Sequence, residues 1–115
     1  MVVASMDCRG QGGFSEDVGG VAGTTFTTPF VRGVDGEPEG LYYRDVYLDC
    51  AMLARIVMGL DYVDAERVGV SGGSQGGGLS VACAALVPQI KRCAPLYPYL
   101  SYYQRVWDMD LDKGA

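Results

Sequence analysis

Short segments rich in apolar residues mark three predicted strands in this chain: residues 2–6, 68–70 and 90–96. Runs of this kind are typical of strands that are buried on both faces of a parallel sheet. Polar, glycine or proline residues follow each run, as expected where a strand ends. We therefore expect three strands within one sheet.

Three longer stretches are predicted helices: residues 41–60, 75–86 and 100–110. Val46, Leu53 and Val57 recur near the helical period of 3.6 residues, so we expect them to share one side of the helix. The second stretch is rich in glycine and alanine, and Pro88 marks its exit. Residues 9–40 are dense in glycine and lack a period, which predicts a loop long enough to be functional or disordered.

These elements follow the order strand, loop, helix, strand, helix, strand, helix. Such alternation is typical of right-handed βαβ units around a parallel sheet, so the predicted fold class is α/β. Three parallel strands leave both outer strands with unpaired edges. We therefore expect residues 1–115 to be part of a larger α/β domain.

Composition and charge narrow the classes of function. The 115 residues suffice for one small domain, and 49% of them are hydrophobic, which argues against disorder. The net charge of -5 argues against a nucleic-acid partner. The sequence contains neither a basic amphipathic stretch nor an apolar run of about 18 residues, so membrane binding lacks support. Residues 1–6 are too short for a signal peptide and lack a basic start.

Four cysteines are present, without a C-x-x-C pair and without any histidine to complete a zinc site. Cys50 and Cys83 lie among apolar neighbours in predicted helices, so we interpret them as buried, reduced thiols. Reduced thiols predict a cytoplasmic protein. A disulfide framework is the alternative.

A G-x-S-x-G motif lies between the second predicted strand and the second predicted helix, at Gly72-Gly73-Ser74-Gln75-Gly76. This is the setting of a nucleophile elbow, in which a tight turn presents the serine hydroxyl at the carboxyl end of the sheet. Ser74 is the predicted nucleophile, and the backbone N–H of Gln75 is a predicted oxyanion-hole donor, helped by the helix dipole. We expect a Cβ at Gly72 or Gly76 to clash with strand or helix.

Two other interpretations of this motif stay open. One is a chance glycine-rich turn. The other is a phosphate-binding loop at residues 76–78, but Lys91 lies too far along the chain to serve as a Walker lysine.

A second motif, Arg9-Gly10-Gln11, precedes Gly73-Ser74-Gln75-Gly76-Gly77. The paired R-G-Q and G-S-Q-G-G motifs resemble those of the acetyl xylan esterase and cephalosporin-C deacetylase family, carbohydrate esterase family 7 of the α/β-hydrolase superfamily. The flanking segments, including Tyr42-Tyr43-Arg44-Asp45, look similar too, so the resemblance covers essentially all of the chain. It implies a partial α/β-hydrolase fold.

The resemblance also implies a function. It is that of a serine esterase that removes acetyl groups from acetylated xylo-oligosaccharides or cephalosporin-type esters, through an acyl-enzyme on Ser74. It assigns the Gln75 N–H to the oxyanion hole and structural support to Arg9, Gly10 and Gln11. It further implies a homo-oligomer for the parent protein. Serine acyl transfer needs no cofactor and no metal, and none is expected here.

The sequence departs from the family pattern in one respect. It contains no histidine, and the family places its triad aspartate and histidine after later strands. Residues 1–115 are therefore expected to be a central fragment of one domain, which lacks the N-terminal part and the C-terminal part with the triad Asp and His. None of five aspartates is a candidate triad acid: Asp61, Asp64, Asp108, Asp110 and Asp112. Asp64 is expected to cap a turn, and the last three to lie on a solvated helix face.

Several alternatives remain. Arg9 is alternatively a surface residue on a flexible loop. Four tyrosines after the third strand either line an acyl pocket or, as we prefer, pack in the core: Tyr97, Tyr99, Tyr102 and Tyr103. Without a histidine base, the isolated chain is expected to be inactive. The alternative functions are a non-catalytic remnant or interaction module, and an α/β-hydrolase of another substrate class, such as a peptidase or a lipase-like enzyme.

Overall fold

The computed structural model describes residues 1–17 and 32–109. Its elements follow in the order 3₁₀ turn Pro38–Gly40, helix α1 (Tyr42–Met58), 3₁₀ turn Ala65–Arg67, strand β1 (Gly69–Gly73), helix α2 (Gln75–Leu86), strand β2 (Arg92–Leu96) and helix α3 (Tyr103–Asp108). Asp110, Asp112 and residues 18–31 of the predicted loop lie outside the described residues. The alternation of helices and strands from residue 42 onward confirms the predicted α/β class.

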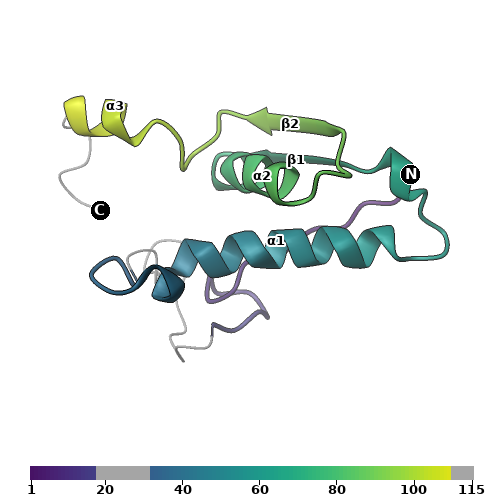
Figure 1. Ribbon diagram of the computed structural model, residues 1–115, viewed down its shortest axis with the longest axis horizontal. Coiled ribbons are helices and arrows are strands. Elements are labelled where there is room, and N and C mark those ends of the chain that lie inside the picture. The colour runs from purple at the N-terminus through teal and green to yellow at the C-terminus, as the bar shows by residue number, and fades with distance from the viewer. Residues whose placement is uncertain (18–31, 110–115) are drawn as a thin grey trace.

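Strands β1 and β2 form a parallel pair, with Gly69 opposite Arg92 and Gly73 opposite Leu96. Helix α2 connects them, as a parallel pair requires. It also contacts both strands and α1, so α2 lies between the sheet and α1 (Figure 1). The βαβ connection predicted for this part of the chain is confirmed.

The core lies between α1 and α2. Its buried residues from α1 recur every three to four positions and meet apolar residues in or just after α2: Tyr42, Val46, Cys50, Ala51, Ala54, Leu79, Cys83, Val87 and Ile90. Three of the five buried residues of α1 are small, namely Cys50, Ala51 and Ala54, which lets the two helices approach closely. Of the three residues expected on one side of α1, Val46 is buried in this core, whereas Leu53 and Val57 are half-buried.

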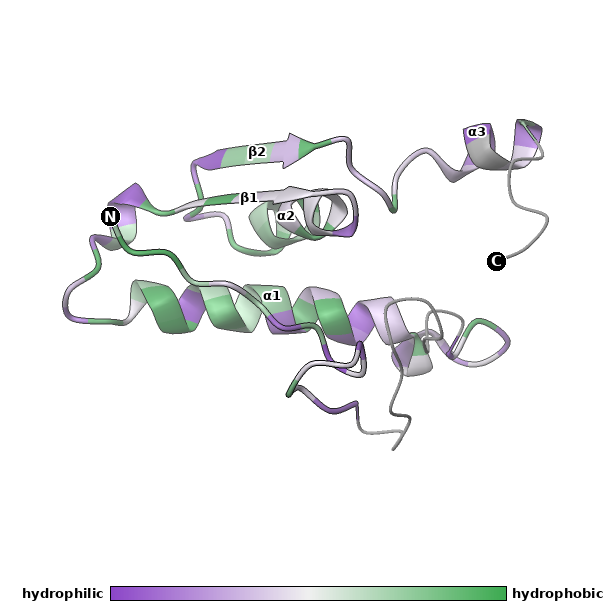
Figure 2. Cartoon of the chain, turned by 180° about the vertical axis from the view of Figure 1, so that it is seen from behind, coloured by the Kyte–Doolittle hydropathy of each residue, from purple (hydrophilic) through white to green (hydrophobic). Residues whose placement is uncertain are grey.

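A second apolar stripe runs along α1 at Leu48, Met52 and Ile56, which are 45%, 60% and 57% exposed. Figure 2 shows hydrophobic positions along most of α1, and these include both the buried core residues and the exposed stripe. A helix that is apolar on several sides is typical of the interior of a larger protein.

Residues 2–6 are not a strand, so the prediction of a first strand was wrong for the described chain. A strand requires ladder hydrogen bonds to a neighbour, and within residues 1–17 and 32–109 the only strand paired with β1 is β2. Val2 and Val3 are instead 54% and 76% exposed, while Met6 and Cys8 pack against the core. The segment runs alongside α1 (Figures 1 and 2).

The other boundaries differ by a few residues. Strand β1 continues through Gly73 because the Ser71-Gly72-Gly73 segment stays in register with β2. Strand β2 begins at Arg92 because the amide of Ile90 closes a turn onto the carbonyl of Val87, at 2.9 Å. Helix α3 is shorter than predicted, since Tyr102 before it has a left-handed backbone, with φ 51°. No helix in the described part of the chain is long and apolar enough to cross a bilayer.

Candidate active site

Ser74 occupies the turn between β1 and α2, with φ 52° and ψ -116°. A non-glycine residue rarely adopts a positive φ, and such a conformation costs about 1–3 kcal/mol. The turn is also sterically tight, because a Cβ at Gly72 would overlap the carbonyl of Gly76. The clash predicted for Gly72 is thus confirmed. Ser74 shares its positive φ with three other non-glycine residues in the described part of the chain, all of which follow β2: Tyr97, Leu100 and Tyr102.

The hydroxyl of Ser74 is not used to cap the helix. Serine at this position normally accepts a hydrogen bond from an amide in the first turn, which stabilises the helix by about 1 kcal/mol. Here the Ser74 side chain makes no capping hydrogen bond, and the residue is exposed. The oxygen therefore stays available for chemistry at the carboxyl end of β1.

Three consecutive glycines follow Gln75, and they play different parts. Apart from the backbone of its own helix, a Cβ at Gly76 would meet no atom of the described residues within 4 Å, so the predicted clash at this position was wrong. A Cβ at Gly77 would lie 2.9 Å from the carbonyl oxygen of Leu96, and one at Gly78 would overlap the carbonyl of Tyr99. The chain that follows β2 therefore passes so close to α2 that only glycine fits at the two later positions.

Gln75 is the first residue of α2, so its backbone N–H has no acceptor within the helix. Its side chain is held at both ends of the carboxamide. The Nε2 atom donates to the hydroxyl of Tyr43 at 3.1 Å, and the thiol of Cys8 donates to Oε1 at 3.7 Å. Both partners are distant in sequence, and neither was predicted to lie at the site.

The R-G-Q segment is anchored on α1. Arg9 donates two parallel hydrogen bonds to the carboxylate of Asp49, at 2.6 and 2.7 Å. The hydroxyl of Tyr42 donates to the carbonyl of Arg9 at 2.6 Å and accepts from Nε2 of Gln11 at 3.0 Å. Gly10 is buried with φ 66°, a backbone conformation that suits glycine. These bonds tie the segment to the helix that also carries Tyr43.

A cluster of charges surrounds this anchor. Asp17, whose side chain is 0% exposed, accepts two hydrogen bonds from Arg32, and Arg32 also donates to Asp45 at 3.0 Å. Arg9 lies 3.6 Å from both aspartates. The cluster balances two guanidinium groups against three carboxylates, Asp49 included. The one signal in the sequence was the spacing of Asp45 and Asp49, which places both on one side of α1.

Burial sets the protonation of the groups around Gln75. Desolvation raises the pKa of the Tyr43 hydroxyl well above its ordinary value, and it also raises the pKa of the Cys8 thiol. The hydrogen bonds that Arg9 donates to Asp49 raise the pKa of Arg9. At neutral pH the side chain of Gln75 is therefore held by two uncharged groups, while Arg9 stays charged.

The structure brings the predicted site residues together in two groups. Ser74, Gln75 and Gly72 form the turn, and Arg9, Gly10 and Gln11 form the anchored segment. Adjacent residues of α1 connect the groups, because Tyr42 contacts the second and Tyr43 the first. A role in catalysis for any of these residues stays a prediction.

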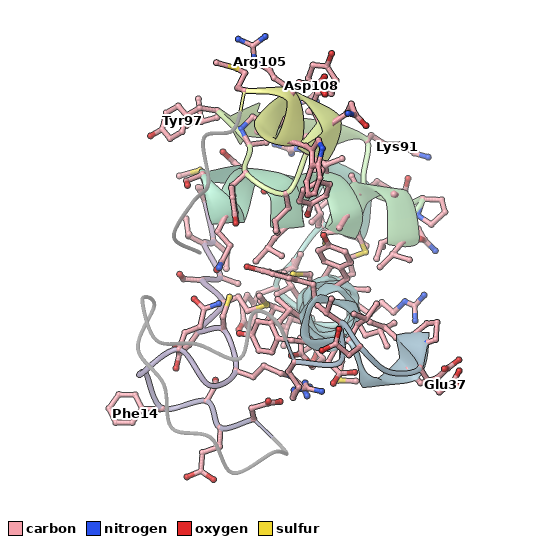
Figure 3. The ribbon with its side chains drawn as sticks, turned by 90° about the vertical axis from the view of Figure 1, so that its left-hand side faces the viewer. Phe14, Glu37, Lys91, Tyr97, Arg105 and Asp108 are labelled. Atoms are coloured by element: carbon pink, nitrogen blue, oxygen red, sulfur yellow. The ribbon has the colours of Figure 1, made fainter. Side chains whose placement is uncertain are left out.

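The tyrosines that follow β2 are not in the described core, so the preferred prediction of core packing was wrong. Tyr97, Tyr99, Tyr102 and Tyr103 are 78%, 50%, 69% and 60% exposed. Figure 3 shows Tyr97 on the outer side of the molecule. Its ring approaches Gly73, since a Cβ there would lie 3.3 Å from the Tyr97 hydroxyl.

The predictions for Asp64 and for two of the cysteines are confirmed. Asp64 caps the 3₁₀ turn Ala65–Arg67 by accepting a hydrogen bond from the amide of Glu66 at 3.1 Å, as predicted. Cys50 and Cys83 are buried free thiols, also as predicted. Among the described residues, no group of three or more His, Cys, Asp or Glu side chains is placed to hold a metal ion.

A strained serine between a parallel strand and a helix, within a βαβ unit, is typical of the α/β-hydrolase fold. This chain forms part of such a fold. The comparisons with known proteins then give the family. The model of the acetyl xylan esterase (AXE1) family matches residues 1–115, so the chain belongs to that family, as the paired motifs predicted.

Three known esterases are similar to this chain. The chain is 54% identical in sequence to acetyl xylan esterase 1 from Thermoanaerobacterium sp. JW/SL YS485. The crystal structure of that protein superposes with a TM-score of 0.84, and the match covers 95% of this chain and 34% of that one. It is 36% identical to the acetyl xylan esterase from Paenibacillus sp. R4, with a TM-score of 0.80, and the match covers 92% of this chain and 33% of that one. The acetyl esterase Axe7A of Xylanibacter ruminicola is 36% identical over 70 residues, which are 61% of this chain and 16% of that protein. The chain thus spans about a third or less of each relative.

Proposed function

We propose that the full-length protein carrying this chain is a serine esterase that removes acetyl groups, and that Ser74 is its nucleophile. One observation carries the proposal. The Ser74 hydroxyl lies in a strained turn at the start of α2 and does not cap the helix, although capping is the ordinary use of a serine there. Membership of the acetyl xylan esterase family supports the same reaction.

In the proposed reaction, Oγ of Ser74 attacks the acetyl carbonyl carbon, and the sugar oxygen leaves with a proton. The oxyanion accepts a hydrogen bond from the N–H of Gln75, where the dipole of α2 favours negative charge. Water then releases acetate from the acyl-enzyme. The base that takes the serine proton is a histidine supplied from outside residues 1–115, because the chain contains none.

The proposed substrates are small acetylated carbohydrates, in particular acetylated xylo-oligosaccharides. The relatives are an acetyl esterase and two acetyl xylan esterases, which supports this class of substrate. Cephalosporin-type acetyl esters are a further proposed substrate, from the resemblance of the motifs. The homo-oligomer and the cytoplasmic location stay predictions.

The R-G-Q segment is proposed to support the site without touching substrate. The side chain of Arg9 donates hydrogen bonds to Asp49, and that of Gln11 donates one to Tyr42. Because these donors already have partners within the protein, we expect them to hold neighbouring residues in place and not to bind a ligand. We therefore expect substitutions in this segment to affect the arrangement of the site before they affect substrate affinity.

The test is acetate release by the full-length protein from acetylated xylo-oligosaccharide and from a 4-nitrophenyl ester series. We expect hydrolysis of the acetate esters, a fall of roughly a thousandfold or more in Ser74→Ala, and little or no activity in the isolated chain of 115 residues. Full activity in Ser74→Ala would overturn the nucleophile. Activity on long acyl chains or peptides instead of acetate would indicate a hydrolase of another substrate class.

A second candidate is a non-catalytic remnant or interaction module. The exposed apolar stripe of α1 at Leu48, Met52 and Ile56 favours it, because such a stripe drives association when nothing covers it. Sedimentation of the isolated chain, together with its thermal unfolding, tests this candidate. A monomer with cooperative unfolding would support an autonomous module, whereas aggregation would indicate a segment that requires the remainder of its domain.

A further inference from the structure

The carboxamide of Gln75 is clamped between two elements that precede it by more than thirty residues. Tyr43 on α1 accepts a hydrogen bond from Nε2, and Cys8 in the N-terminal segment donates one to Oε1. A carboxamide bonded at both ends has one orientation and one rotamer. The side chain of Gln75 is therefore fixed although its own backbone begins a helix, where the chain is ordinarily free to fray.

This clamp matters because of the atom to which it is connected. The N–H of Gln75 has no partner within α2 and is aimed by the φ and ψ angles of the turn at Ser74. Fixing the side chain of Gln75 fixes its Cα, and with it the direction of that N–H. Oxyanion stabilisation depends steeply on such placement, since a misplacement of about 1 Å can reduce a rate a hundredfold.

Tyr43 is well placed to bear on Gln75. Its ring packs edge-on against that of Tyr42, with centroids 5.2 Å apart, and lies tilted against that of Tyr47, with centroids 6.0 Å apart. Tyr42 is itself bonded to Arg9 and Gln11. Contacts therefore run without a break from the R-G-Q segment, through two adjacent tyrosines, to Gln75.

We propose that Tyr43 is a positioning residue for the oxyanion hole, which acts through the side chain of Gln75 to orient the Gln75 N–H beside Ser74. The inference rests on the proposed function, because it requires that Ser74 forms the oxyanion. Tyr43 does not touch the substrate. Its effect is on the rate of acyl transfer rather than on binding.

The experiment compares five forms of the full-length protein: wild type, Tyr43→Phe, Gln75→Ala, the double variant, and Tyr47→Phe as the control. Tyr43→Phe keeps the ring and removes only the hydroxyl. Tyr47→Phe does the same one turn along α1, at a hydroxyl that makes no hydrogen bond within residues 1–17 and 32–109. Each protein is first titrated with a fluorophosphonate, and kcat is expressed per labelled serine.

We expect kcat for 4-nitrophenyl acetate to fall about tenfold in Tyr43→Phe and in Gln75→Ala, with KM within about twofold of wild type. Because both substitutions break the same bond, the double variant should also fall about tenfold and not a hundredfold. Tyr47→Phe should keep the kcat of the wild type.

The outcomes separate two failures. A wild-type kcat per labelled serine in Tyr43→Phe, even with a lowered melting temperature, would show a merely structural tyrosine and overturn the inference. A hundredfold loss in the double variant would do the same, because it would mean that the two residues act independently. Absence of label at Ser74 in the wild type would overturn the proposed function first, and the inference with it.

Discussion

The backbone amide of Tyr99 donates a hydrogen bond to the carbonyl oxygen of Ser74, at 2.9 Å. The amide of Ser74 in turn donates to the carbonyl of Leu96, at 3.0 Å. Both peptide groups around Ser74 are therefore held by the chain that follows β2. The close approach of this chain to Gly77 and Gly78 makes the arrangement possible. The turn owes its shape to backbone contacts, and the serine side chain is left out of them.

It follows that Ser74→Ala should leave stability unchanged, within about 0.5 kcal/mol, because the hydroxyl caps nothing and alanine has the same Cβ. Urea unfolding of the full-length protein measures this. The control is Asp64→Ala, which removes a side chain that does cap a turn and should cost about 1 kcal/mol. A loss in Ser74→Ala equal to that in Asp64→Ala would contradict the account of an uncapped serine.

Gly72→Ala should destabilise the protein by about 2 kcal/mol or more, and should reduce activity, because its Cβ would overlap the carbonyl of Gly76 and force the turn open. The matched substitution is Gly76→Ala, whose Cβ has open space among the described residues. Since alanine favours helix over glycine, Gly76→Ala should be neutral or more stable by up to about 1 kcal/mol. Thermal unfolding of both variants provides the comparison. Equal losses would show that the glycine at position 72 is not sterically required.

Arg9→Lys should lower the free energy of unfolding by about 1–2 kcal/mol, because an ammonium group keeps the charge but loses the paired hydrogen bonds to Asp49. The same exchange at Arg67 is the control. That side chain is 83% exposed and lies 3.9 Å from Asp64, so Arg67→Lys should change stability by less than about 0.5 kcal/mol. Urea titrations of the two variants decide the matter. Indistinguishable stabilities would mean that the anchor on α1 contributes little.

Stability should fall at alkaline pH in part through Cys50. Burial raises the pKa of its thiol from 9.0 to about 12, so the folded protein keeps the proton that the unfolded chain loses above pH 9. The stabilising contribution is fully present below pH 9 and is lost toward pH 12, by up to about 1.4 kcal/mol per pH unit. Burial also raises the pKa of Cys83, which adds in the same direction.

Unfolding free energies of the wild type and of Cys50→Ala, measured below and above pH 9, test this sign. Below pH 9 the variant should be less stable because of the cavity, and above pH 9 its decline with pH should be shallower than that of the wild type. Parallel declines would show that the thiol of Cys50 does not stay protonated in the folded protein.

Local patterns predicted the elements that depend on neighbours in sequence. The helices at residues 42–58 and 75–86, the parallel strands and the cap at Asp64 follow from apolar spacing, glycine positions and a turn signal, all of which are short-range. The βαβ order then required β1 and β2 to be parallel. Strand 2–6 failed for the opposite reason, because a strand depends on a partner and no apolar run specifies one.

The contacts that connect the site were out of reach of the sequence. The hydrogen bond from Gln75 to Tyr43 depends on how α2 packs against α1. The hydrogen bond from Arg9 to Asp49 and the burial of Asp17 depend on where the described part of the loop lies against α1. The motifs predicted which segments meet but not which side chains do. The expected clash at Gly76 was wrong because the tight approach falls one and two residues later, where β2 exits beside α2.

The most direct test of the central claim is to treat the full-length protein with a fluorophosphonate and locate the adduct by peptide mass spectrometry. We predict a single modified site, at Ser74, formed in proportion to the loss of acetylesterase activity and blocked by excess acetate ester. An adduct on another serine, with Ser74 unmodified and activity lost, would contradict the assignment of Ser74 as the nucleophile.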